Sequence, residues 1–162
     1  MADRAQGKVG FTPIVTILAD ADSDAVDAIH HDIKGSLGGE MLYTKADAND
    51  KWFYSTTKDV TNTHANLISG SFTETGTVAV GDHVKFLFVK NSGTTDGSTS
   101  TAATVLLTFD GGDPSTQSDV IEIGAEEAFQ CKFKAGLTVQ NLHAETSTGT
   151  VRCTVCAILD DV

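Results

Sequence analysis

The sequence lacks any long apolar run. No stretch of its 162 residues approaches the about 20 consecutive apolar residues that a membrane-spanning helix needs. The N-terminal residues, Met1 to Lys8, also contain no apolar core of the kind that a secretory signal peptide carries. We therefore expect no membrane association and no secretion by that route.

Basic residues are scarce. The chain has 11 Lys and Arg against 22 Asp and Glu, which gives a formal net charge of −11. Such a chain repels nucleic-acid phosphates and anionic lipid at distances beyond a Debye length. We therefore expect no nucleic-acid partner, whereas a basic protein surface would suit this charge.

Cysteine is also rare, with three residues that cannot all pair within one chain. Cys153 and Cys156 form a CxxC pattern, but no second CxxC accompanies it. If this segment is a strand, residues three apart face opposite sides and cannot bind one ion together. We interpret all three cysteines as small buried thiols in a reducing compartment.

Familiar catalytic motifs are missing. The sequence has no GxSxG, no GxxxxGK[ST], no HExxH and no GxGxxG after a strand. His64, His83 and His143 stand singly, and we expect them to be polar surface residues. Folding could bring two of the many carboxylates together for glycoside hydrolysis, but no spacing selects such a pair. We therefore predict no enzyme, no catalytic residues and no cofactor.

One acidic segment resembles the start of a calcium-binding loop. Asp20, Asp22 and Asp24 have the spacing of the first ligands of an EF-hand. The pattern then fails, because Ala25 stands where glycine is needed and His31 where the bidentate glutamate belongs. These three aspartates are the candidates for a cation, although we favour a short helix or an irregular acidic loop here.

Alternating side chains dominate the C-terminal third, from Asp119 to Asp160. The apolar side of this alternation holds Phe129, Cys131, Phe133, Val151, Cys153, Val155, Ala157 and Leu159. A period of two is typical of strands with one buried face and one face in water. The turns between these strands are supplied by Gly124–Glu127, Ala135–Gly136 and Thr146–Gly149.

Earlier segments predict further strands, namely 11–19, 41–43, 52–57, 77–80, 83–89 and 104–109. Within 83–89, Val84, Phe86 and Phe88 are predicted to share a face opposite Lys85 and Leu87. About nine short strands at this spacing predict an all-β, antiparallel β-sandwich or jelly-roll-like fold. We expect a flexible arm over residues 1–10, a single β-sandwich domain over 11–162, and a surface loop over 91–100.

A few residues are candidates for binding a partner. Arg4 and Lys8 make the arm locally basic, so it could dock on a neighbouring subunit, and Phe11 follows directly. Trp52 and Tyr54, two apart in a strand, share a face. Core or interface packing is the interpretation that we favour for these aromatics, with a sugar-stacking platform as the alternative.

The second half of the chain resembles small structural proteins of tailed-bacteriophage virions, especially capsid decoration (cement) and head-fibre proteins. The likeness lies in three pieces: Val84–Asn91 with its return at Val105–Gly112, then Ile121–Phe129, and then Gly136–His143 with Gly149–Ile158. The sequence departs from the family pattern at Ala125, where the turn often has glycine.

This resemblance implies a β-sandwich subunit, often trimeric, that binds the major capsid protein on the outer surface of the shell. The expected location is the virion, after assembly in the host cytoplasm, and the reduced cysteines suit that compartment. The expected role is to stabilise the capsid by bridging neighbouring capsomers. The alternative is a receptor- or glycan-binding module on a tail or fibre.

Overall fold

The computed structural model describes residues 4–9, 39–44, 49–73, 75–134 and 136–162. The chain divides into two compact units, one made of Met1–Ala5 with Tyr43–Val162 and the other of Gln6–Leu42. Strands β1 (Arg4–Val9) and β2 (Gly39–Thr44) form a two-stranded sheet. Part of the expected arm over residues 1–10 is therefore a strand, with backbone groups that pair with a neighbour.

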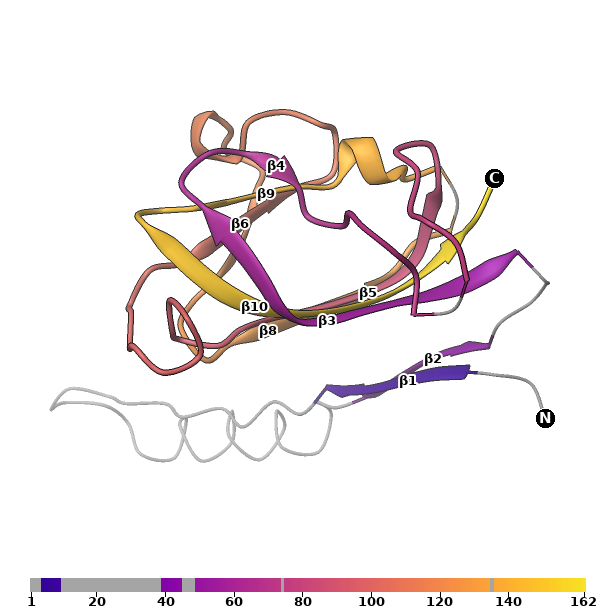
Figure 1. Cartoon of the computed structure of the whole chain (residues 1–162), viewed down its shortest axis with the longest axis horizontal. Helices are drawn as coiled ribbons and strands as arrows, with labels where there is room; N and C mark the ends of the chain where they lie inside the picture. Colours follow the sequence, from indigo (N-terminus) through magenta and orange to yellow (C-terminus); the bar gives the residue numbers. More distant parts are fainter. Residues whose placement is uncertain (1–3, 10–38, 45–48, 74, 135) are drawn as a thin grey trace, which may run out of the picture. The chain divides into compact units, whose positions relative to one another are not determined.

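The larger unit contains a long four-stranded antiparallel sheet (Figure 1). Its strand order is β3-β10-β5-β8, with β3 at Asp50–Thr61, β10 at Thr150–Asp160, β5 at His83–Asn91 and β8 at Ala128–Lys132. The last strand of the chain, β10, lies between β3 and β5 and pairs with both along its length. We refer to this sheet as the large sheet.

A second four-stranded antiparallel sheet forms the other layer. Its order is β4-β9-β6-β7, with β4 at Ala65–Asn66, β9 at His143–Thr146, β6 at Val105–Thr108 and β7 at Ile121–Ile123. We refer to it as the small sheet, because its strands are short. Two single-turn 3₁₀ helices accompany the small sheet, η1 at Pro114–Thr116 and η2 at Val139–Asn141. The predicted all-β sandwich is confirmed.

Strand β10 supplies much of the core between the layers. Its alternate residues Val151, Cys153, Val155, Ala157 and Leu159 are fully buried and belong to one apolar cluster with residues of the small sheet. The sequence predicted this alternation correctly. Burying a large apolar side chain contributes about 2 kcal/mol of transfer free energy, so this strand is a major source of stability.

The predicted pattern of strand β5 is wrong at one point. Val84, Leu87 and Val89 belong to the core cluster, whereas Phe86 does not. Phe86 and Phe88 therefore share the opposite face, and Val84 is not on it. The cause is an irregularity in the pairing with β10, which shifts the register by one residue and exchanges the faces.

The predicted strand Thr77–Val80 is not formed. This segment makes an isolated bridge from Thr77 to Ser71 instead. The carboxylate of Asp82 accepts a hydrogen bond from the Ala79 N–H at 2.8 Å, and the Asp82 N–H donates to the Ala79 carbonyl at 3.2 Å. These two bonds turn the chain before β5 and leave Val80 56% exposed.

Several sequence-based candidates fall outside the described residues. They are the predicted strand over 11–19, the short helix, the aspartates Asp20, Asp22 and Asp24, and the partner candidate Phe11. Within the described residues, no helix is long and apolar enough to cross a membrane.

Candidate functional site

Aromatic and aliphatic side chains line up across the large sheet in two neighbouring rows. The pairing places Trp52 opposite Ile158 and Ile158 opposite Phe86 in one row, and Tyr54 opposite Cys156 and Cys156 opposite Phe88 in the next. Directly opposed residues of antiparallel strands have Cβ atoms about 5 Å apart, so each row is a chain of side-chain contacts. We call these six residues the apolar outer face.

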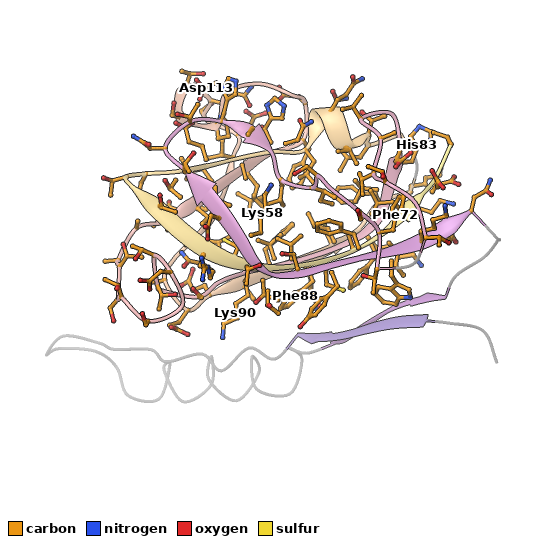
Figure 2. The ribbon with its side chains drawn as sticks, in the orientation of Figure 1. Lys58, Phe72, His83, Phe88, Lys90 and Asp113 are labelled. Atoms are coloured by element: carbon orange, nitrogen blue, oxygen red, sulfur yellow. The ribbon has the colours of Figure 1, made fainter. Side chains whose placement is uncertain are left out.

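The apolar outer face lies on the side of the large sheet that points away from the small sheet. The residues that alternate with it, such as Phe53, Leu87 and Ala157, belong to the core cluster between the layers. Strand alternation then places the six residues on the other surface. Figure 2 shows Phe88 on this side of the sheet, opposite to Lys58 and Phe72.

Exposure varies across the apolar outer face. Tyr54 is 58% exposed, which makes it one of the largest exposed apolar side chains among the described residues. Trp52 and Phe88 are half-buried, whereas Phe86 and Ile158 are buried. The accessible part is therefore aromatic, and tyrosine and tryptophan are the residues that protein interfaces favour most strongly.

Polar groups border the apolar outer face. Strand β8 continues the two rows with Lys132 beyond Phe86 and Gln130 beyond Phe88. The Gln130 side-chain nitrogen is buried and has no hydrogen-bond partner. An apolar centre with a polar rim is the usual composition of a protein interface.

The far end of the same surface is charged. Arg152 Nε lies 3.0 Å from Asp59 Oδ1, and Lys90 pairs with Glu126 at 3.6 Å. The Asp59 carboxylate, which accepts hydrogen bonds from Arg152, raises the pKa of the guanidinium. These exposed pairs contribute little to stability, and they mark where the apolar region ends.

The loop over residues 91–100, expected to be long and flexible, has an ordered centre. The Asp96 carboxylate accepts hydrogen bonds from the N–H and hydroxyl groups of Thr99 and Ser98 at 2.7–3.0 Å. These bonds, the Thr99 N–H first, hold the pKa of Asp96 well below its ordinary value. Arg152 Nη1 also donates to the Asp96 carbonyl, which ties the loop to β10.

The cysteines are unsuited to nucleophilic chemistry. Cys153 lies in the core and Cys156 on the apolar outer face, so the two residues of the CxxC face opposite sides as the sequence predicted. Burial raises the pKa of Cys131 and of Cys153 to about 12, and it also raises that of Cys156. Thiols that stay protonated neither attack substrates nor bind metals.

Charged side chains at the end of the large sheet pair with one another. Lys85 Nζ lies 2.8 Å from Asp50 Oδ1 and 3.0 Å from Asp160 Oδ2, and Lys51 pairs with Asp161. Asp50 is fully buried, so this arrangement neutralises an interior charge. Across the described parts of the chain, no group of three His, Cys, Asp or Glu residues is placed to hold a metal ion.

The structure brings some of the candidate partner-binding residues together and leaves others apart. The structure brings Trp52 and Tyr54 together on one surface, as their spacing predicted. Arg4 and Lys8 lie in β1, and their side chains are outside the described features. Sequence reasoning missed Cys156 and Ile158, although their apolar character on the otherwise polar side of β10 was a usable signal.

Comparison of the chain with known protein families, with curated proteins and with solved structures found no match. The site is therefore interpreted from its own geometry.

Proposed function

We propose that the chain is a structural subunit of a tailed-bacteriophage virion that decorates and stabilises the capsid shell. In this proposal, copies of the chain pack together through the apolar outer face as a homo-oligomer, for which a trimer is the expected form. The assembled subunits then bind the major capsid protein.

The observation that supports this proposal is the apolar outer face itself. A sheet already packed on one side by a complete core has no need of aromatic side chains on its other side. Tyr54 nevertheless remains 58% exposed, beside the half-buried Trp52. Covering such a surface with another protein is favourable, because it removes apolar area from water.

The chemistry of the surface favours a second copy of this chain as the occupant. The six side chains of the apolar outer face carry no charge, and interfaces between identical subunits are the more apolar class. Two copies with a formal charge of −11 each would repel through their polar surfaces. The remaining acidic surface suits a basic patch on the shell protein.

Repetition provides the stabilisation that a single contact lacks. Linked copies convert each further contact with the shell into an intramolecular event, which raises the overall avidity without a new kind of contact. A symmetric oligomer that bridges neighbouring capsomers would therefore resist their separation.

Self-association is tested by sedimentation equilibrium of the purified chain and two variants. Tyr54→Lys places a charge in the proposed contact, and loss of about 1.4 kcal/mol or more per contact would weaken association at least about tenfold. Val80→Lys is the matched control, because Val80 is 56% exposed and lies on the turn before β5. Equal association of the two variants would reject the contact surface.

The effect on the shell is tested with particles that lack the chain. Such particles should break at lower temperature or weaker osmotic shock, and added wild-type chain should restore their resistance. Val80→Lys should restore resistance as well, whereas Tyr54→Lys should fail. Particles with unchanged resistance after loss of the chain would reject the decoration role.

A glycan- or receptor-binding module remains the second proposal, because the exposed Tyr54 beside Trp52 also forms an aromatic platform suited to sugar rings. A glycan array and a host-cell binding assay separate the two. Binding to cells or glycans that Tyr54→Ala abolishes, with no binding to capsids, would favour this second function.

A further inference from the structure

Lys58 of β3 points into the sandwich, toward the small sheet. It lies opposite Cys153 of β10, which is fully buried in the core cluster, and the buried Val60 follows on the same side of the strand. Figure 2 shows Lys58 between the two layers, on the side of the large sheet opposite to Phe88. Lysine is rarely directed inward in this way, because burial takes its ammonium group out of water.

An irregularity in the strand pairing produces this orientation. Ser55 lies opposite Val155, another core residue, so strict alternation would place Thr57 inward and Lys58 outward. The register between β3 and β10 shifts at this point, because Lys58 pairs with Cys153. The shift gives β3 one extra residue and turns Lys58 inward, away from the apolar outer face.

The Lys58 amine has neutral hydrogen-bond partners. Its Nζ donates to the Asn66 carbonyl at 3.4 Å and to the Ser69 hydroxyl at 3.2 Å. Among the described residues no carboxylate forms an ion pair with this amine, and the adjacent Asp59 pairs with Arg152 instead. The positive charge of Lys58 is therefore held without a paired negative charge.

Burial changes the balance between the charged and the neutral amine. It lowers the pKa of Lys58, and the neighbouring Asp59 and Cys153 oppose this shift without cancelling it. Lys85 of the same sheet differs, because two carboxylates lie 2.8 and 3.0 Å from its Nζ. At a given pH, more of Lys58 than of an exposed lysine is therefore in the neutral form, which is the nucleophilic one.

A small pocket lies beside Lys58, and its lining comes from the end of β3, from β4 and from β9. The pocket has a volume of about 40 Å³. The buried Val60 and Ala144 give it an apolar side, whereas Thr61 and Ala65 are exposed, so it opens to solvent. Such a volume holds about three water molecules, which matches the few heavy atoms of an acetyl group.

We propose that Lys58 is a modification site that accepts a small acyl group, such as acetyl, from an acyl phosphate. The neutral amine attacks the carbonyl carbon, a C–N bond forms, and the C–O bond to phosphate breaks. The proton lost by the amine leaves with the phosphate, so atoms and charge balance. The amide product keeps one N–H for the Ser69 hydroxyl or the Asn66 carbonyl, and the pocket takes up the methyl group. The modification removes a positive charge from the chain.

Mass spectrometry of the folded chain after treatment with acetyl phosphate at about pH 7.5 tests the site, with the exposed Lys134 as the control in the same sample. Lys58 should be acetylated at least about threefold faster than Lys134, because more of its amine is neutral. This ratio should fall as the pH rises toward about 10, where exposed lysines also lose their proton. In guanidinium chloride, which unfolds the chain, the two rates should agree within about twofold.

Two variants test the role of the pocket. Ala65→Leu places a larger side chain at the opening and should slow acetylation of Lys58 by about threefold or more, without changing that of Lys134. Asn62→Leu is the matched control, because Asn62 is exposed and lies outside the pocket lining. Acetylation of Lys58 no faster than that of Lys134 in the folded chain overturns the proposal. So does a rate at Lys58 that the two variants change equally.

Discussion

Replacement of Asn91 tests how the two layers of the sandwich are joined. Asn91 ends β5 and is fully buried. Its side-chain amide donates to the Ala103 carbonyl at 3.0 Å and to the Ile123 carbonyl at 3.2 Å, and its oxygen accepts the Gly93 N–H at 2.8 Å. Ala103 adjoins β6 and Ile123 lies in β7, so this one side chain connects the large sheet to the small sheet.

The size of the effect follows from these three bonds. A buried hydrogen bond contributes about 1 kcal/mol net, and the partners that lose it stay unsatisfied. Asn91→Ala should therefore lower the free energy of unfolding by about 3 kcal/mol. For a domain of this size, such a loss lowers Tm by about 6–12 °C. Urea denaturation followed by circular dichroism gives the value directly.

Two variants control this measurement. Asn62→Ala removes an exposed asparagine and should change the stability by less than about 0.5 kcal/mol. Asn91→Asp keeps the acceptor for Gly93 but turns a carboxylate toward two carbonyl oxygens. Burial and these oxygens would raise the pKa of the new carboxyl, so its penalty should shrink as the pH falls toward about 4. A loss below about 1 kcal/mol in Asn91→Ala would refute the reasoning.

Three other outcomes are expected. Glu126 has a φ of 68°, a conformation that glycine adopts without strain, so Glu126→Gly should raise the free energy of unfolding by up to about 1 kcal/mol in urea denaturation. Glu127→Gly should lower it instead, because the Glu127 carboxylate accepts a hydrogen bond from the Gly124 N–H. Burial raises the pKa of Cys131 and Cys153 to about 12, so a thiol reagent near pH 8 should leave both unlabelled in the folded protein and label them in urea. Rapid labelling of either cysteine in the folded chain would contradict their burial. Asp96→Ala should speed hydrogen exchange of the Thr99 amide, whereas Asp96→Asn, which keeps the accepting oxygen, should not; equal rates in the two variants would contradict the assigned role of Asp96.

The sandwich was predictable because the period of two in a strand is visible locally. In β10, the alternation of Val151, Cys153 and Val155 with polar residues is enough to identify the buried face. The faces of β5 were not predictable in the same way. They depend on where the register of its pairing with β10 shifts, because a shift of one residue moves every side chain beyond it to the other face of the sheet.

The candidate site was predictable only in part. Trp52 and Tyr54 share a face through their local spacing, but their alignment with Phe86 and Phe88 through β10 requires the order of the strands. The stacking of the His64 and His143 rings likewise depends on the pairing of β4 with β9, so two histidines that stand singly in the sequence meet in the fold. Long-range pairing of this kind leaves no local pattern in the sequence.

Locating the chain in a reconstruction of the whole particle tests the central proposal most directly. We expect the subunit on the outer surface of the capsid shell, with Tyr54 and Trp52 buried against a neighbouring copy. A subunit located at the tail or at a fibre tip, or one on the shell with Tyr54 facing solvent, would contradict the proposal.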